Sequence, residues 1–281
     1  MSGTRTRSAA QPFLLPAAPG ERFCVLHRPA DGVAVKGGFV FVPPFAEEMN
    51  KSRRMAALQA RRFAALGFAT LLLDLHGCGD SSGDFVDARL ATWQRDIGTA
   101  VAWLAAAGFG PVRLWGLRFG ALLAASAIGE KTSGDVSGLL LWQPVLSGES
   151  QLTQFLRIAA AADMLSGGSA GGGSAALRKR LAAGETLEVA GYAIAADLAR
   201  AMDRLRLAEA DPGSIPVTWL EVSADAANAA LPPGAARVVE AWRGRGVAIE
   251  CEVVGGDPFW TTVEIAECPE LIARTSGHAV R

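Results

Sequence analysis

Residues 111–128 read PVRLWGLRFGALLAASAI, and this stretch decides the fold. Its first part, Pro111–Trp115, is an apolar run typical of a short buried strand. A sharp turn flanked by glycines follows at Gly116–Gly120, and a helix of small residues continues from there to about Ile128. Strand, tight turn and helix in direct succession form an elbow, which lifts the middle residue of the turn above the end of a parallel sheet. In this chain the middle residue is Arg118.

The chemistry of Arg118 differs from that of a nucleophile. A guanidinium stays protonated in proteins, so it cannot attack a carbonyl group. A cation above a helix N-terminus can bind a carboxylate or phosphate with bidentate geometry. It can equally pair with an internal acid and close a site that has lost its chemistry. The sequence leaves both alternatives open.

Strands and helices alternate on both sides of the elbow. Strand-like runs are expected at Arg22–Arg28, Gly38–Val42, Ala69–Asp74, Gly138–Gln143, Pro216–Val222 and Ala248–Val254. Helices are expected at Ser52–Leu66, Ala88–Ala106 and Thr262–Arg274. Strands that are apolar on both faces and separated by helices predict an α/β fold, with a mostly parallel central sheet covered by helices on both faces.

One segment interrupts this alternation. Residues 149–211 are helical in composition and contain a Gly/Ser-rich loop at 166–175, which is typical of a flexible linker or the tip of a mobile lid. We expect this segment to form a helical cap. The expected boundaries are a flexible N-terminal segment at 1–20, a core at 21–148 and 212–276, a cap at 149–211 and a tail at 277–281.

The composition excludes several classes of protein. The 281 residues carry 27 basic and 28 acidic side chains, and this balance argues against a nucleic-acid binder. Half of the residues are hydrophobic, yet no run approaches the roughly 18 apolar residues of a membrane helix. The N-terminus lacks the features of an export signal, and the four cysteines have no paired spacing. We expect a cytoplasmic protein that binds a small molecule, without a metal or cofactor, and we leave a homodimer open.

Several stretches together resemble a known family. FVPPFAEEMNKSRR (41–54), LLLDLHGCGDSSGDF (71–85), WGLRFGALLA (115–124) and GGDPFW (255–260) resemble the α/β-hydrolase superfamily. More narrowly, they are similar to the second hydrolase-like family encoded with the exosortase A/PEP-CTERM system, which accompanies exopolysaccharide and protein-sorting loci of Gram-negative bacteria. The resemblance covers about residues 22–274. It implies an α/β-hydrolase fold with a helical cap, and it supplies no substrate.

The same resemblance indicates where a catalytic triad would lie. It places the nucleophile at Arg118, one oxyanion donor at the backbone N–H of Phe119, and the other near Phe45 or Ala46. The acid would follow strand 216–222, where Asp225 stands.

The histidine would follow the last strand, where this chain has Pro258. Two triad members are therefore absent, and an ordinary serine-hydrolase mechanism is not expected.

Two further residues in the turn after Ala69–Asp74 are candidates for catalysis. Gly79–Gly83 matches the pattern of a serine elbow, but four residues separate it from the next helix, so Ser81 is expected to bond backbone groups of the turn. Cys78 would be reactive only if its thiol pKa were lowered, and cysteines in apolar chains are mostly packing residues.

Polar and aromatic residues at the strand ends complete the expected site. Glu48 could have a raised pKa and act as a general base, or it could belong to a salt-bridged loop at a helix N-terminus. The residues expected to hold a ligand are Phe45, Ala46, Glu48, Arg118, Phe119, Gln143, Asp257 and Trp260. The candidates for catalysis are Glu48, Cys78, Ser81 and Asp225.

Three functions follow from these observations. The first is a pseudoenzyme that binds an anionic, acyl or glycan-related small molecule through Arg118. The second is an active hydrolase or acyl transferase with a non-standard nucleophile or a water activated by Glu48. The third is a structural or partner-binding protein.

Overall fold

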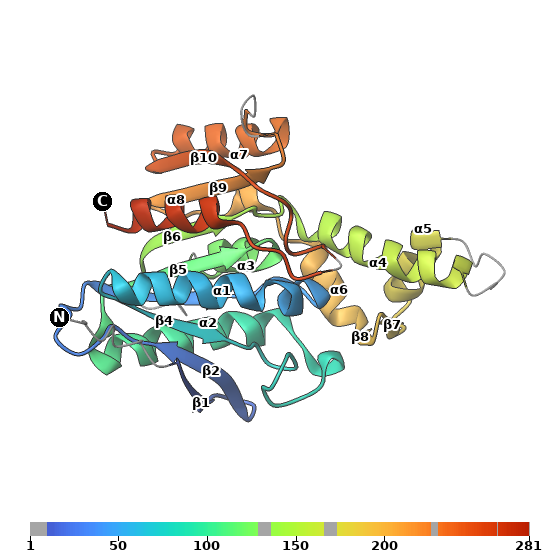
Figure 1. The fold of residues 1–281 in the computed structure, drawn as a ribbon. Coiled ribbons are helices and arrows are strands. Elements are labelled where there is room, and N and C mark those ends of the chain that lie inside the picture. Colours follow the sequence, from blue (N-terminus) through green and yellow to red (C-terminus); the bar gives the residue numbers. More distant parts are fainter. Residues whose placement is uncertain (1–9, 129–135, 166–172, 226–229, 263, 281) are drawn as a thin grey trace.

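The computed structural model describes residues 10–128, 136–165, 173–225, 230–262 and 264–280 (Figure 1). Its central sheet is built from β1 (Ala10–Pro16), β2 (Glu21–His27), β3 (Gly37–Val42), β4 (Phe68–Leu73), β5 (Val112–Leu117), β6 (Val136–Trp142), β9 (Val217–Ser223) and β10 (Ile249–Gly255). The strand order is β1-β2-β4-β3-β5-β6-β9-β10. β2 runs antiparallel to both of its neighbours, and all other neighbouring strands are parallel. The mostly parallel sheet predicted from the sequence is confirmed.

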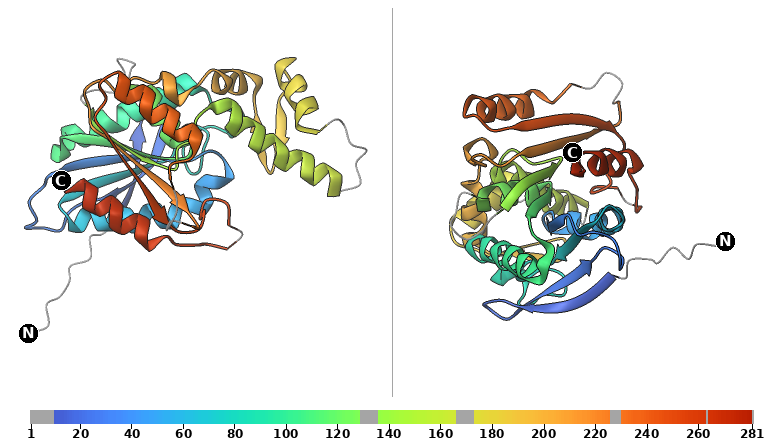
Figure 2. Two further views of the ribbon diagram at one scale, coloured as in Figure 1. Left: turned by 90° about the horizontal axis from the view of Figure 1, so that it is seen from above. Right: turned by 90° about the vertical axis from the view of Figure 1, so that its left-hand side faces the viewer.

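Helices cover both faces of this sheet (Figure 2). One face carries α1 (Glu47–Ala65) and α8 (Pro269–Ala279), and the other carries α2 (Leu90–Leu104), α3 (Phe119–Ile128) and α7 (Pro233–Gly244). Each face has its own core. Phe63 of α1 stacks on Phe39 under the first layer, and Trp242 of α7 packs on Trp219 under the second. Strands buried on both faces explain why their sequences are continuously apolar.

The N-terminal segment differs from the expectation. Residues 1–9 lie outside the described residues, but residues 10–16, expected to be flexible, form the edge strand β1. Pro12 and Pro16 conceal this strand in the sequence, and an edge strand tolerates proline because one side of its backbone needs no partner. Phe13 anchors the strand on Trp103 of α2, with 4.6 Å between the ring centroids.

The C-terminal tail and the last helix also differ. Residues 277–279, expected in the tail, belong to α8, which begins and ends later than the predicted helix at 262–274. His278 belongs to the tail expected at 277–281, yet its ring nitrogens lie 3.0 Å from Glu250 Oε2 and 2.9 Å from Glu252 Oε2. These contacts hold the end of α8 against β10.

The first helix begins before the predicted position. Ser52 was expected at its N-terminus, but α1 starts at Glu47, directly after the chain leaves β3. Ser52 instead lies inside the helix and donates to Met49 O at 3.1 Å. Two carboxylates, Glu47 and Glu48, therefore stand in the first turn, where the helix dipole favours negative charge.

The insertion between β6 and β9 projects beyond the carboxyl ends of the parallel strands (Figure 1). It contains α4 (Gly148–Leu165), α5 (Gly173–Ala182), β7 (Leu187–Val189), β8 (Tyr192–Ile194) and α6 (Ala196–Asp203), so a two-stranded hairpin accompanies the expected helices. Part of the predicted Gly/Ser-rich loop, residues 166–172, lies outside the described residues, and residues 173–175 belong to α5. We refer to residues 148–211 below as the cap.

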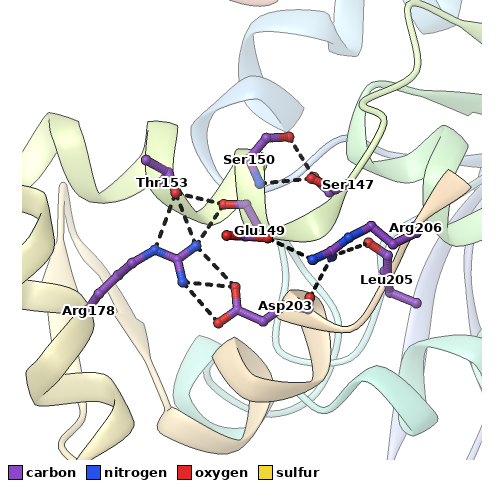
Figure 3. A network of polar contacts seen from close by, with 8 residues as sticks. All are labelled: Ser147, Glu149, Ser150, Thr153, Arg178, Asp203, Leu205 and Arg206. Atoms are coloured by element: carbon purple, nitrogen blue, oxygen red, sulfur yellow. Dashed lines mark hydrogen bonds and ion pairs between the residues drawn. The ribbon is translucent and has the colours of Figure 1, made fainter. Parts of the chain in front are cut away.

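A network of polar contacts holds the helices of the cap together (Figure 3). The guanidinium of Arg178 on α5 donates to both carboxylate oxygens of Asp203 on α6, at 3.0 to 3.1 Å. It also donates to Glu149 O at 2.8 Å and to Thr153 Oγ1 at 3.0 Å, both on α4. On the other side, Arg206 Nη2 lies 2.7 Å from Glu149 Oε2. The network fixes the first turns of α4, which face the core.

No helix in the described part of the chain combines the length and apolar character that are needed to span a bilayer. Across the same residues, no group of three or more His, Cys, Asp and Glu side chains is arranged to hold a metal ion.

Candidate functional site

The elbow predicted from the sequence is present at the junction of β5 and α3. Arg118 adopts φ +56°, in the left-handed region, and its N–H donates to Trp142 O at 3.0 Å. The two flanking glycines are required by close packing. A Cβ atom at Gly120 would overlap the carbonyl oxygens of Val42 and Pro43, and one at Gly116 would overlap the backbone of α3. The turn therefore lifts the side chain of Arg118 above the carboxyl end of the sheet.

The guanidinium of Arg118 is held from three directions. Its Nε lies 3.4 Å from Glu48 Oε1, and its Nη2 donates to Gln154 Oε1 at 3.3 Å. Its Cζ lies 5.4 Å from the centroid of the Trp260 ring, in a cation–π arrangement. The side chain is only 13% exposed. The ion pair with Glu48 is long for a charge-assisted hydrogen bond, so Arg118 is restrained without being sealed.

Glu48 is the acid that faces Arg118, and burial dominates its electrostatics. Desolvation raises the pKa of Glu48, and Arg118, Gln151 and Lys51 oppose this rise without cancelling it. One carboxylate oxygen, Oε2, is buried without a hydrogen-bond partner among the described residues. A raised pKa, as predicted from the sequence, and a buried oxygen without a partner both suit a general base at this position.

A cavity of about 210 Å³ lies between the first turn of α1, the cap helix α4 and the loop after β10. Glu48, Gln154 and Trp260, which contact Arg118, all line it, whereas Ala46, Arg118 and Phe119, also expected to hold a ligand, are not among its lining residues. The full lining is Phe45, Glu47, Glu48, Lys51, Gln151, Gln154, Phe155, Ile158, Trp260 and Thr261. The lining residues of α4 recur every three or four positions, so they share one face of the helix.

Aromatic rings form the apolar side of this cavity. Phe45, in the loop after β3, packs against Phe119 of the elbow, with 5.6 Å between the centroids, and against Phe155 of α4 at 5.0 Å. Ala46 follows with φ +52° and is buried, so the chain turns sharply into α1 here. Phe119 occupies the first position of α3, where a backbone N–H has no partner inside the helix.

Comparison with known proteins gives this arrangement a family. A family model described as serine aminopeptidase S33, of the α/β-hydrolase superfamily, matches residues 35–232. The chain belongs to this α/β-hydrolase family. No curated protein matches the sequence.

Solved structures share the hydrolase fold at low sequence identity. Est1E from Butyrivibrio proteoclasticus, solved with ferulic acid, is 16% identical over 95% of this chain and 97% of that chain, with a TM-score of 0.65. A soluble variant of monoglyceride lipase from Saccharomyces cerevisiae, solved with a substrate analogue, is 12% identical over 98% and 94%, with a TM-score of 0.64. XC6422 from Xanthomonas campestris, described as a serine hydrolase without a lid, is 13% identical over 98% and 94%, with a TM-score of 0.56. These likenesses show the fold alone.

None of the three histidines of this hydrolase-family chain, all of which lie in the described residues, makes a hydrogen bond with Arg118. His27 is buried in β2, and His278 lies between two glutamates of β10. His76 packs in the turn after β4, where its ring lies against Gly83. Burial lowers the pKa of both His27 and His76. The position expected for the triad histidine, Pro258, is exposed.

Ser81 has a structural role in its turn. Its hydroxyl donates to Asp74 O at 2.7 Å and accepts from Phe23 N at 2.8 Å. These bonds to backbone groups are those predicted from the glycine-rich turn. Because the hydroxyl proton is directed at a carbonyl oxygen, the structure does not arrange Ser81 as a nucleophile.

Cys78 lies in the same turn and is also unsuited to catalysis. Burial raises the pKa of its thiol strongly, and the nearby carboxylates of Asp74 and Asp96 raise it further. A reactive cysteine needs the opposite shift, because the thiolate is the nucleophile.

Three other expected site residues make contacts outside the cavity lining. Gln143 Oε1 accepts from Val222 N at 2.6 Å, so this side chain links the ends of β6 and β9. Asp225 is exposed, and its N–H bonds Ser223 Oγ at 3.2 Å. Asp257 is exposed in the loop after β10, although Trp260 from the same loop lines the cavity.

Three polar residues near Arg118 were not predicted from the sequence. Gln151 and Gln154 lie on the cap helix, whose position over the elbow follows from no local signal. Glu221 is buried in β9 and accepts from Trp219 Nε1 at 2.7 Å. Burial raises the pKa of Glu221, which the Trp219 hydrogen bond and the charge of Arg118 lower again. A charged residue inside an otherwise apolar strand was the signal that could have revealed it.

Proposed function

We propose that this member of the α/β-hydrolase family binds a small molecule in the cavity between α1, α4 and the loop after β10 and does not carry out Ser-His-Asp chemistry. The observation that carries the proposal is the contact set of Arg118. The residue at the nucleophile position is a cation restrained by Glu48, Gln154 and Trp260, all of which line the cavity.

The surrounding residues support binding in place of acyl transfer. Acyl transfer needs a nucleophile and a base within hydrogen-bond reach of one another. Arg118 cannot be the nucleophile, and each of the three histidines is placed in another part of the fold. What remains is a partly apolar hollow with a few convergent polar groups, which is the usual composition of a ligand site.

A blocking variant tests this proposal. Ile158 lines the cavity and is 45% exposed, so Ile158→Trp should fill the hollow without disturbing the core. We expect it to abolish the thermal stabilisation given by any bound probe from a panel of neutral saccharides, short acyl acids and inorganic phosphate. Ile265→Trp changes an equally apolar, exposed residue outside the lining and serves as the matched control. Probes that stabilise both variants equally would show that the cavity is not the binding site.

A second function, hydrolysis by an activated water, is favoured by one observation. Glu48 combines a raised pKa with a buried oxygen that lacks a partner, as a general base beside the cavity would. Turnover of p-nitrophenyl acetate by the wild type, lost in Glu48→Gln and retained in Ile265→Trp, would establish this alternative over ligand binding alone.

The genomic context of the protein is part of the proposal. The stretches at 41–54, 71–85, 115–124 and 255–260 resemble the hydrolase-like family of exosortase loci, so we place this protein with an exopolysaccharide and protein-sorting locus and in the cytoplasm. Fractionation of cells, with detection of the tagged chain in the soluble cytoplasmic fraction, tests the location.

A further inference from the structure

The chemistry of the ligand can be read from the polar atoms of the cavity that have no partner. Glu48 Oε2 and Gln151 Oε1 are both buried, both belong to lining residues, and neither has a hydrogen-bond partner among the described residues. Gln151 is 4% exposed. Buried polar atoms in native proteins are nearly always bonded, so two unpaired acceptors at one cavity indicate a missing donor.

Both unpaired atoms are acceptors by their chemistry. An amide oxygen only accepts hydrogen bonds, and so does an oxygen of an ionised carboxylate.

The cations at the cavity are only partly used. Lys51 Nζ lies 3.2 Å from Glu47 Oε1 and 3.4 Å from Thr261 O, so contacts within the protein already engage this ammonium group. Arg118 donates through Nε to Glu48 and through Nη2 to Gln154. A guanidinium has five N–H groups, so further donors of Arg118 remain for a ligand. The cavity thus presents free acceptors, and Arg118, which contacts three of its lining residues, keeps free donors next to them.

This combination discriminates between ligand classes. A carboxylate at neutral pH only accepts, and it would place more acceptors against Glu48 and Gln151. Inorganic phosphate keeps a P–OH donor but adds negative charge beside the Glu48 carboxylate. An ammonium group only donates, and it would face Arg118 as a like charge. A hydroxyl group both donates and accepts, so neighbouring hydroxyls satisfy all of these atoms at once.

We infer that the cavity binds a neutral polyhydroxylated molecule of the saccharide class. Its hydroxyls donate to Glu48 Oε2 and Gln151 Oε1 and accept from Arg118, and its apolar face packs against Phe45, Phe155 or Trp260. The inference rests on the proposed ligand-binding function, and it replaces the anionic ligand considered from the sequence.

Calorimetric titration of the full chain at pH 8 tests it. The neutral probes are glucose, trehalose, maltose and myo-inositol. Acetate and butyrate represent acceptors only, inorganic phosphate represents a multiply charged anion, and methylammonium represents donors only. We expect binding of at least one neutral probe and weaker or no binding of the charged ones.

Two variants address the unpaired acceptors directly. Gln151→Leu should lower the affinity for the neutral probe roughly three- to tenfold. Glu48→Gln should lower it roughly ten- to a hundredfold, because a hydrogen bond to a charged group contributes more free energy. The matched control is Gln59→Leu. Gln59 is a buried glutamine of α1 that also has an unpaired Oε1, but its amide lies against Ser276 of α8 and outside the cavity lining. The affinity of the Gln59→Leu variant for the neutral probe should equal that of the wild type.

The possible outcomes distinguish a failure of the saccharide class from a failure of the proposed ligand-binding function. If acetate, butyrate or phosphate binds, Ile158→Trp blocks it, and no neutral probe binds, the saccharide class is wrong while the binding function stands. If neutral probes bind equally to wild type, Gln151→Leu and Glu48→Gln, the unpaired acceptors are not the contacts and the inference fails. If Ile158→Trp blocks no probe at all, both the inference and the proposed function fail.

Discussion

Arg118 holds a backbone conformation that a non-glycine residue adopts only at a cost of about 1–3 kcal/mol. Elbow strain of this kind usually serves to expose a nucleophile. Here the strained position exposes a cation, and the glycines at 116 and 120 still provide the close packing that the turn needs. The backbone conformation of the elbow is therefore intact, although the nucleophilic side chain is absent.

Restoring the hydroxyl alone should not restore chemistry. Arg118→Ser is expected to hydrolyse p-nitrophenyl acetate no faster than the matched variant Arg118→Ala. General-base assistance is worth about 10²–10⁴-fold, and the structure places no histidine beside residue 118. Initial rates of both variants and of the wild type check this.

A serine variant that is more than tenfold faster than the alanine variant would contradict the expectation. The base would then be Glu48, which faces position 118. Adding Glu48→Gln to Arg118→Ser should in that case remove the gain.

Glu48 should also shape the pH dependence of stability. Its folded pKa is raised above the ordinary value of 4.5, so the folded state binds more protons than the unfolded state in the interval just above that value. The free energy of unfolding contributed by Glu48 therefore falls as pH rises through this interval. Glu48→Gln lacks this pH-dependent loss of stability. The melting temperature of the variant minus that of the wild type should therefore be larger at pH 7 than at pH 4.

The measurement is thermal unfolding of both proteins across this pH range, with Glu267→Gln at an exposed acid as the control. If the melting temperature of the variant minus that of the wild type instead decreases as pH rises from 4 to 7, the ion pair with Arg118 outweighs burial and holds the pKa of Glu48 below 4.5.

At the scale of elements, the sequence predicted the parallel strands well because each is buried on both faces and therefore continuously apolar. Phe68–Leu73 and Val112–Leu117 are such strands. Prediction from the sequence failed where tertiary contacts override local signals. β1 contains two prolines, and Glu47 begins α1 without a side-chain cap.

The site was predictable in part for the same reason. Arg118 and Glu48 follow strands whose carboxyl ends meet at one edge of the sheet, so their proximity followed from the topology. Gln151 and Gln154 reach the same place from the cap, and no residue in α4 encodes the angle at which that helix crosses the core.

The contact between α3 and the end of β3 offers a test of this element packing. Gly120→Ala should destabilise the fold by about 1–3 kcal/mol, because its Cβ would overlap the carbonyl oxygens of Val42 and Pro43. Gly277→Ala, on the exposed face of α8 with no atom near the added Cβ, should instead stabilise by about 0.4–1 kcal/mol. Denaturant unfolding measures both. Equal effects of the two substitutions would mean that the elbow can relax and that the close approach is not required.

At the scale of the whole molecule, the cavity exists only because the cap lies over the core. Phe155 and Gln154 come from α4, whereas Phe45 and Arg118 come from the loop and turn above the sheet. The opposite side of α4 is held by Arg178, through Glu149 and Thr153, to the other cap helices (Figure 3). Cap rigidity and ligand affinity should therefore be linked.

Arg178→Met tests this link. The substitution removes the bidentate contact with Asp203 and the bonds to α4. The side chains of Arg178 and Asp203 are 27% and 36% exposed, so these contacts contribute about 1–2 kcal/mol locally. Amide hydrogen exchange in α5 and the first turns of α4 should accelerate roughly 5- to 30-fold, while exchange in the central strands stays unchanged. Arg180→Met, which breaks only an exposed pair with Glu185, is the matched control.

Affinity for a probe that Ile158→Trp blocks should fall in Arg178→Met and not in Arg180→Met, because Gln151 and Gln154 lose their fixed position when α4 loosens. Faster exchange in α5 with unchanged affinity would show that the contact between Phe155 and Phe45 alone positions α4. The polar network would then stabilise the outer cap without supporting the cavity. Unchanged exchange in all cap helices would mean instead that the hydrophobic packing of the cap, through residues such as Leu198 and Met202, holds these helices without Arg178.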